Sequence, residues 1–199
     1  MKRKRKKTDW TGRIILLVAL IGIGASMYLL LRPGMYHPPK PKVEKRSALR
    51  EKRGVVLYFS DEEEEYLIGE RREISRKGDR EEEAKELIAE LIKGPKGKLI
   101  PTVPPRTRLL TLKLREDGMA RVDFDESLSR DHPGGSSSEM MTIYSIVNSL
   151  TLNFPDIKRV QILIDGKEIE TITGHLSLKN PFSSNPGLIK GPGKGPVSN

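Results

Sequence analysis

The segment HPGGSSSEMM, His132 to Met141, holds the residues best suited to chemistry. A histidine near serines could supply a nucleophile and its base, if an acid converged on the same point. Glycines before a helix could instead hold an anion on free backbone amides. A third reading is structural: Ser136 caps the helix and Glu139, three residues on, reaches back to it, as in a capping box.

The surrounding sequence favours the structural reading. The chain has three histidines, His37, His132 and His175, and it has no G-x-S-x-G nucleophile elbow. The preceding stretch DFDESLSRD carries four acidic residues, whose field repels an anion. We therefore predict that Ser136 is a helix N-cap with Glu139 as its partner, and that the chain has no catalytic residue.

Metal and cofactor sites are not supported by the sequence. The chain contains no cysteine, which excludes disulfides, zinc-thiolate sites and a lipid-modified cysteine. The segment DFDES lacks the spacing of a calcium loop, and we expect Asp123 and Asp125 to point outward beside an inward Phe124. GPKGK is too short to be a phosphate-binding loop. We predict no metal and no cofactor, and the sequence does not identify the binding residues.

Charge is unevenly distributed along the 199 residues. Residues 1–53 hold 15 Lys/Arg against 3 Asp/Glu, whereas residues 54–175 hold 18 against 24. The net charge of +9 therefore reflects the two ends of the chain and not its centre. A nucleic-acid-binding domain carries its basic patch on the folded part, so we predict no nucleic-acid partner.

An apolar segment near the N-terminus indicates a membrane anchor. Residues 14–31 are 18 residues without a charge, and as a helix they span about 27 Å, close to the hydrocarbon thickness of a bilayer. A cleaved signal peptide is the alternative, although its apolar core usually has only about 7–15 residues. Because residues 1–13 are strongly basic, we expect them to be cytoplasmic and the rest of the chain to lie outside a bacterial inner membrane.

The folded part should be a single domain between two irregular segments. Residues 32–53 are rich in proline and basic residues and read as a tether. Residues 176–199 are rich in glycine and proline, and we expect a largely disordered tail. The remaining segment, residues 54–175, can bury one core.

Apolar periodicity within residues 54–175 predicts an α+β fold. Continuous or alternating apolar residues predict strands at 55–59, 66–74, 110–114 and 120–124, and a last strand pair at 158–172 that turns at Asp165 and Gly166. Helical spacing predicts amphipathic helices at 79–93, with Asp79 as N-cap, and from 140 to 154. In the order β-β-α-β-β-α-β-β, both helices should pack on one face of a mostly antiparallel sheet.

Several segments in this order resemble the GerMN family of sporulation and germination proteins. They are VVLYF, ELIAELIKGP, PTVPPRTRLL, GMARVDF, GGSSSEMMTIYSIVNSLTLNFPDIKRVQILIDGK and TGH, spread over residues 55–175. The resemblance implies an extracytoplasmic domain held by a lipid anchor or a membrane helix, which acts by binding without known catalysis. Relatives of the fold occur in ring-building modules of sporulation complexes. This chain departs from the pattern in lacking a lipidated cysteine and in having one copy of the domain.

These observations predict a single-pass membrane protein that displays a noncatalytic, GerMN-like module to the cell envelope. Its partner would be another envelope protein or a second copy of the chain. The alternative is a cell-wall hydrolase or carbohydrate-processing enzyme, which would need two carboxylates facing one cleft.

Overall fold

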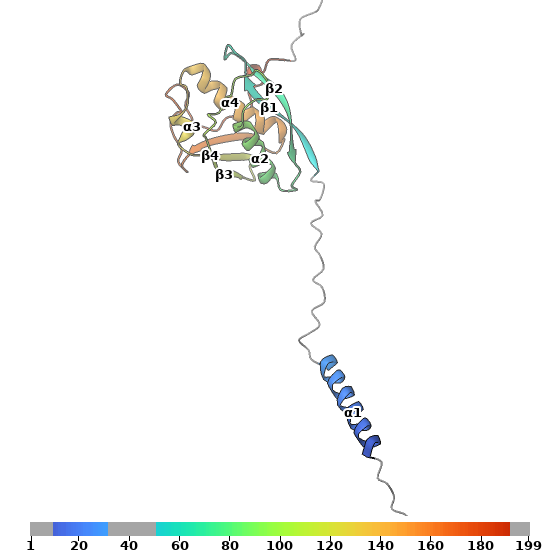
Figure 1. Cartoon of the computed structure of the whole chain (residues 1–199). Coiled ribbons are helices and arrows are strands. Elements are labelled where there is room, and N and C mark those ends of the chain that lie inside the picture. The colour runs from blue at the N-terminus through green and yellow to red at the C-terminus, as the bar shows by residue number, and fades with distance from the viewer. Residues whose placement is uncertain (1–9, 32–50, 192–199) are drawn as a thin grey trace, which may run out of the picture. The chain divides into compact units, whose positions relative to one another are not determined.

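The computed structural model describes residues 10–31 and 51–191 (Figure 1). Contacts divide the chain into two units, Met1–Arg46 and Ser47–Asn199. Residues 1–9 of the predicted basic tail, residues 32–50 of the tether predicted over 32–53 and residues 192–199 of the predicted C-terminal tail lie outside the described residues. Lys52 and Arg53, at the end of the predicted tether, belong to the first strand of the domain.

The first unit contains one helix, α1 (Trp10–Leu31). It begins four residues before the uncharged segment and therefore includes Arg13. Within the part of the chain that the structure describes, no helix combines the length and the apolar character that crossing a membrane requires, so the expected span is not confirmed.

The second unit is an α+β domain. Its elements are β1 (Lys52–Ser60), β2 (Leu67–Ser75), α2 (Arg80–Ile92), β3 (Leu109–Leu114), β4 (Met119–Phe124), α3 (Ser127–Arg130), α4 (Ser136–Asn153), β5 (Arg159–Ile164) and the 3-10 turn η1 (Pro186–Leu188). The first seven predicted strands and helices are present, and the short helix α3 was not foreseen. The acidic run Asp61 to Glu65 lies in the connection between β1 and β2, where the buried Asp61 accepts the backbone N–H groups of Glu65 and Tyr66.

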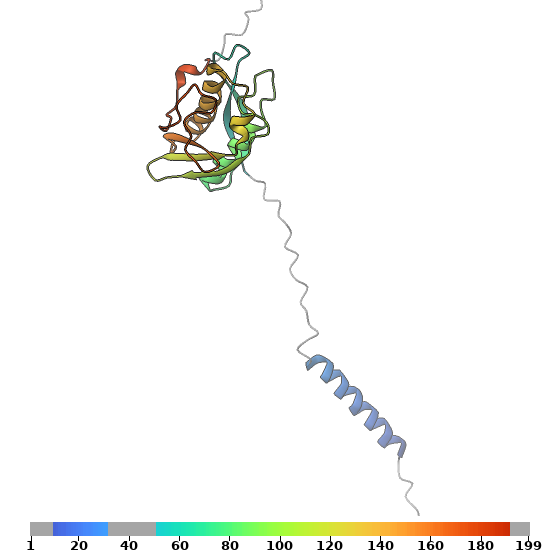
Figure 2. The same ribbon diagram turned by 90° about the vertical axis from the view of Figure 1, so that its left-hand side faces the viewer.

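The strands form two sheets instead of the expected single, mostly antiparallel sheet. β1 and β2 make an antiparallel ribbon, and β3, β4 and β5 make a separate sheet in that order (Figure 2). β5 runs parallel to β4, with Met119 opposite Arg159. The connection through α3 and α4 is long enough to return the chain in the same direction, which apolar periodicity alone does not reveal.

The second strand of the predicted last hairpin is absent. The turn is there, with positive φ of 47° at Asp165 and 75° at Gly166, but only Lys167 then pairs back with Ile164. The following residues leave the sheet because Ile172 donates its backbone N–H to Glu139 of α4. The edge of β5 pairs instead with Phe182, through reciprocal hydrogen bonds of 2.8 Å between Val160 and Phe182.

The segment expected to be a disordered tail is in part structured. Residues 176–191 are described, and Leu178 is fully buried in the core. Asn185 donates its backbone N–H to the side-chain oxygen of Asn148 on α4 at 2.9 Å. Lys190 donates its backbone N–H to the carbonyl of Leu67 at the start of β2. These contacts extend the domain well beyond residue 175.

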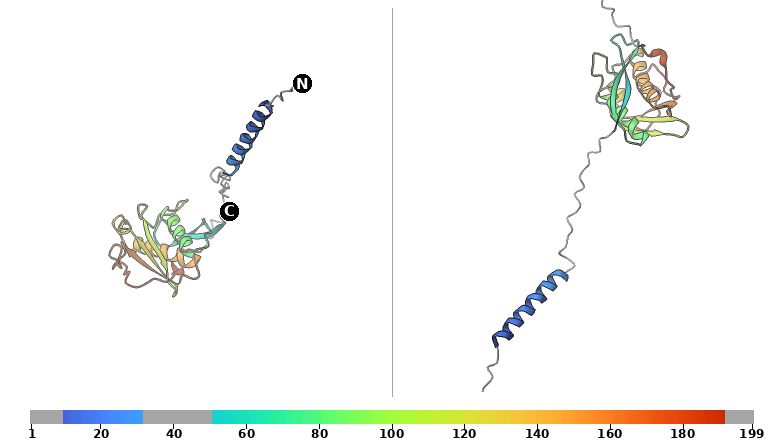
Figure 3. Two further views of the ribbon diagram at one scale, coloured as in Figure 1. Left: turned by 90° about the horizontal axis from the view of Figure 1, so that it is seen from below. Right: turned by 90° about the vertical axis from the view of Figure 1, so that its right-hand side faces the viewer.

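The core joins both sheets through the two helices. α2 buries the predicted apolar face, and Asp79 caps it by accepting the N–H of Glu81 at 3.0 Å. α4 lies beside β1 and also packs on β5 and α2 (Figure 3). The inner face of the β1–β2 ribbon completes this core with Val55, Leu57, Phe59 and Ile74.

A polar stripe on α4 hydrogen-bonds the edge of β1 that β2 leaves free. Ser145, Ser149 and Asn153 are four residues apart, so they lie on one face of the helix. Ser145 donates to the carbonyl of Tyr58 at 2.7 Å, and Ser149 accepts the N–H of Tyr58 at 3.1 Å. The amide of Asn153 accepts the N–H of Val56 at 2.9 Å and donates to its carbonyl at 2.7 Å. These side chains thus supply the hydrogen bonds that the backbone of a third strand would supply in a larger sheet.

We predict that Asn153→Ala destabilises the domain by about 2 kcal/mol, because it leaves two backbone groups of Val56 without partners. Chemical unfolding followed by circular dichroism measures this difference. The control is Thr151→Ala, since the Thr151 hydroxyl bonds only the carbonyl of Val147 within the same helix. Equal stability of the two variants would show that the stripe does not support β1.

Candidate functional site

The loop before α4 is built differently from the predicted capping box. α4 starts at Ser136, and the N-cap is Gly135, which has φ of 90° and makes no side-chain capping bond. An L-residue strongly disfavours this conformation, so the glycine pair makes the turn into the helix. The prediction that Ser136 is the N-cap is therefore wrong.

Glu139 does not reach back to the start of the helix. Its side chain is fully buried and accepts hydrogen bonds from the loop at residues 172–175. The donors are the backbone N–H groups of Ile172 at 2.8 Å, Thr173 at 3.2 Å and His175 at 2.9 Å, and the hydroxyl of Thr173 at 3.0 Å. Burial alone raises the pKa of Glu139, but these four donors outweigh it and hold the pKa below its ordinary value of 4.5.

His132 has a structural role in the same region. Its Nδ1 accepts the N–H of Gly134 at 3.0 Å, so the proton sits on Nε2, which lies 2.9 Å from the Thr142 hydroxyl. Thr142 in turn donates to the backbone carbonyl of Thr102. Burial lowers the pKa of His132, which keeps this neutral form. No hydrogen bond in the described part of the chain joins the His132 ring to a serine hydroxyl, so a serine-hydrolase arrangement is not assembled there.

Asp123 and Asp125 of the neighbouring segment are buried instead of pointing outward. Asp123 accepts the N–H of Gly166 at 2.8 Å and so fixes the turn after β5. Asp125 accepts the N–H of Arg108 at 2.9 Å and its guanidinium Nε at 2.8 Å. Across residues 10–31 and 51–191, no three His, Asp or Glu side chains are placed to hold a metal ion.

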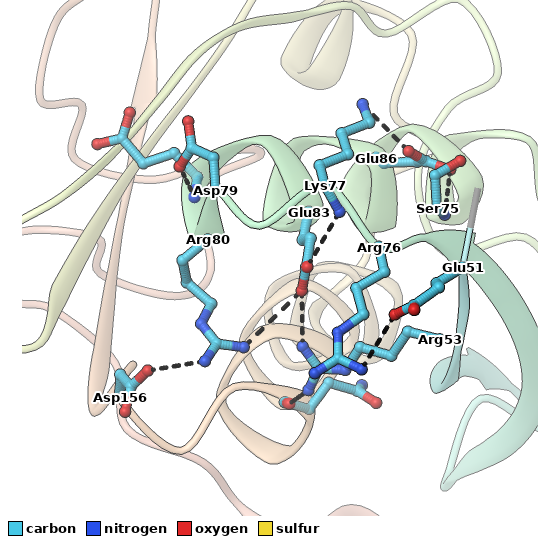
Figure 4. Close-up of polar contacts among 12 residues, drawn as sticks. Glu51, Arg53, Ser75, Arg76, Lys77, Asp79, Arg80, Glu83, Glu86 and Asp156 are labelled. Carbon is cyan, nitrogen blue, oxygen red and sulfur yellow. Dashed lines mark hydrogen bonds and ion pairs between the residues drawn. The ribbon is translucent and has the colours of Figure 1, made fainter. Parts of the chain in front are cut away.

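A charged cluster centred on Glu83 joins three elements at the start of β1 (Figure 4). Glu83 accepts from Arg53 at 2.9 Å and from the N–H of Lys77 at 3.2 Å, and it lies 3.8 Å from Arg80. Both guanidinium groups also lie over the ring of Phe154, at 4.7 Å for Arg53 and 5.6 Å for Arg80. Through these contacts the cluster holds β1, α2 and the residue that follows α4 together.

Two hollows lie on the surface of the β1–β2 ribbon. A hollow of about 690 Å³ is lined by residues that include Gly54, Val56, Arg71, Glu73 and Lys96. A second, more apolar hollow is lined by Val56, Tyr58, Ile68 and Gly69 of the ribbon, together with residues 189–191. Gly54 in the first hollow and Gly69 in the second have no side chain that could fill the space.

The outer edge of β2 presents free backbone groups. Because Val56 and Tyr58 direct their N–H and C=O toward α4, their partners Arg71 and Gly69 direct theirs away from β1. Glu73, two residues after Arg71 on the same strand, likewise directs its N–H and C=O away from β1. In the described residues, the backbone groups of Gly69, Arg71 and Glu73 take part in no hydrogen bond with another segment.

The sequence predictions did not foresee the α4 stripe, the role of Glu139 or the buried Arg72. Arg72 is 6% exposed, pairs with Glu70 at 2.5 Å and donates to the carbonyl of Gly94 at 2.9 Å, which ties β2 to the end of α2. The signal for the stripe was present as two serines and an asparagine at four-residue spacing along the helix. No comparable spacing marks Glu139 or Arg72.

Comparison with known proteins agrees with this architecture. The model of the Germane family, described as "Sporulation and spore germination", matches residues 56–170. The chain belongs to the Germane family. No curated protein matches the chain.

Three solved structures are similar to this Germane chain. A candidate lipoprotein from Clostridium perfringens is 27% identical with a TM-score of 0.50, and the match covers 70% of this chain and 93% of that one. The tandem GerMN domains of the sporulation protein GerM from Bacillus subtilis are 18% identical with a TM-score of 0.52, over 67% of this chain and 46% of that one. The first GerMN domain alone is 20% identical with a TM-score of 0.52, over 66% and 97%.

We predict that Glu139→Gln destabilises the domain at pH 7 by about 1–3 kcal/mol, since a neutral amide is a weaker acceptor for four donors. The folded-state pKa of Glu139 is lowered, so its stabilising contribution is complete above pH 4.5 and is lost as the pH falls through the folded-state pKa. The difference between wild type and variant should therefore shrink from pH 7 to pH 3. Urea unfolding at both pH values measures it, and a difference that does not change with pH would refute the assignment.

Proposed function

We propose that this chain is a noncatalytic, extracytoplasmic binding module of a bacterial cell envelope, with a role related to sporulation or germination. One observation carries the proposal: the side chains best suited to chemistry are occupied within the fold. Glu139, His132 and Asp125 each hold a loop through hydrogen bonds. The membership in the Germane family supports the same conclusion.

A cell-wall glycoside hydrolase would need a carboxylic acid whose pKa is raised to act as general acid. The larger hollow on the ribbon does contain two carboxylates, Glu73 and Glu90. Glu73 pairs with Lys52 at 2.8 Å, which lowers its pKa, and Glu90 pairs with Lys93 and lies 3.5 Å from Arg72. Both carboxylates are thus held in ion pairs, which disfavours the hydrolase alternative.

Membrane attachment through α1 is the second part of the proposal. The described side chains of α1 from Arg13 to Tyr28 are all exposed, including Ile15 at 70% and Ile23 at 66%. Apolar surface of this extent is unfavourable in water, and a lipid environment would cover it. The basic N-terminal residues support a cytoplasmic location for this end of the chain and an extracytoplasmic location for the Germane domain.

The binding partner in this proposal is another envelope protein or a second copy of the chain. Confinement to a membrane raises the effective concentration of either partner without any new contact. The net acidic charge of residues 54–175 opposes self-association and is screened by salt.

We predict that protease added to intact spheroplasts digests the domain, and that the chain stays in the membrane fraction at its full mass of 22.4 kDa after alkaline carbonate extraction. A cytoplasmic marker protein controls for lysis. Digestion only after lysis would contradict the orientation. Recovery of a shorter, soluble chain would show that the N-terminal segment is a cleaved signal peptide.

A further inference from the structure

The two edges of the β1–β2 ribbon are treated differently by the rest of the chain. The edge of β1 is occupied from Val56 to Ser60, because α4 bonds the N–H and C=O groups of Val56 and Tyr58. Ser60 continues this closure through two hydrogen bonds with Ile100. The edge of β2 is open at Gly69, Arg71 and Glu73, so over this length the ribbon offers a partner the edge of β2.

The described part of the C-terminal segment pairs with the edge of β2 at Leu67. Ile189 pairs with Leu67 in a parallel bridge, and Lys190 donates its N–H to the Leu67 carbonyl at 2.9 Å. In this register the next donor to the edge, toward the Gly69 carbonyl, would be residue 192. That residue is proline, which has no N–H to donate. Among the residues that the structure describes, the outward hydrogen-bonding groups of Gly69, Arg71 and Glu73 are thus open to another strand.

The charges along the edge of β2 indicate which kind of added strand would bind there. Of the cations that line the hollow beside it, Lys52 is paired with Glu73 and Arg72 with Glu70. Arg71 and Lys96 have no carboxylate within ion-pair distance among the described residues. An added strand would lie directly against Arg71, so carboxylates on alternate residues would meet the unpaired cations.

We propose that the outer edge of β2, from Gly69 to Glu73, binds an extended acidic segment of an envelope protein by strand addition. The backbone groups of Gly69, Arg71 and Glu73 supply the hydrogen bonds, and Arg71 and Lys96 supply the charge preference. The inference rests on the proposed binding function and names the partner's chemistry and the surface that receives it.

The test uses the full chain in uncharged detergent micelles and a fluorescein-labelled, end-blocked peptide in which Thr-Glu is repeated five times. Fluorescence anisotropy at low ionic strength should show saturable binding of this peptide and none of a Thr-Lys counterpart. Arg71→Glu with Lys96→Glu should weaken binding at least about tenfold, because two favourable charge contacts become repulsive. The matched control, Lys158→Glu with Lys167→Glu, changes the same net charge at two exposed cations without ion pairs, and binding should stay within about twofold.

A backbone variant separates strand addition from simple charge attraction. Arg71→Pro removes an outward N–H without touching the β1–β2 ladder, and edge strands tolerate proline in this orientation. It should lose binding, whereas Arg71→Ala, which keeps the N–H, should lose only part of it. Circular dichroism confirms that both variants are folded, and the charge-reversal pair decides the outcome if the proline variant is not.

Four results would overturn the inference. They are no saturable binding up to millimolar peptide, equal loss in the control pair, unchanged binding by Arg71→Pro, or a dimer in sedimentation that Arg71→Pro dissolves and the peptide does not. The last result would assign the edge to a second copy of the chain. None of these four changes the outcome of the protease and extraction experiment, so the proposed envelope location stands or falls separately.

Discussion

The hydrogen bonds between the polar stripe of α4 and the edge of β1 are the interaction on which the rest of the domain depends. A two-stranded ribbon is only marginally stable by itself in water. Ser145, Ser149 and Asn153 satisfy the free edge of β1 and so attach the ribbon to the helix that also packs on β5. The apolar face of the ribbon is thereby held against the core shared with the other sheet.

The use of polar groups within the fold supports the proposal that the domain is noncatalytic. Buried polar side chains need partners, and the acidic side chains discussed above find theirs in neighbouring segments of the fold. Glu139 holds the 172–175 loop, Asp125 holds Arg108, and Glu83 joins β1 to α2. What remains for function is surface, and the β1–β2 ribbon provides it as an open edge with two hollows beside it.

The parts of the fold that follow from local pattern could be predicted from the sequence. The helix over 80–92 has a single apolar face and a good cap, and the strand pair around Gly118 alternates cleanly, so both were foreseen. Pairing between distant segments was not foreseen, because the apolar periodicity of the sequence does not indicate that β5 pairs in parallel with β4. The prediction of a second strand in the last hairpin was wrong because of a tertiary contact. The N–H of Ile172 is bound by Glu139 of α4 and not by a strand.

The candidate site was the least predictable feature. The segment around His132 matched a capping box in spacing, but the backbone of Gly135 turns the chain in a way that removes the cap, and Glu139 is used over a long sequence distance. Whether a strand edge is open depends on which other segments pack beside it, and the residue types of the strand do not indicate this. Only the register of β1 against β2, read with the α4 contacts, identifies Gly69, Arg71 and Glu73 as outward-facing.

Residue-resolved amide hydrogen exchange of the free chain tests the central claim, that one edge of the ribbon is closed by side chains and the other is open. The account predicts slow exchange at Val56 and Tyr58, whose N–H groups are bound by Asn153 and Ser149. In β2 it predicts alternation, with Glu70 and Arg72 slow and Gly69, Arg71 and Glu73 fast. Fast exchange at Val56 and Tyr58, or uniform protection along β2, would contradict it.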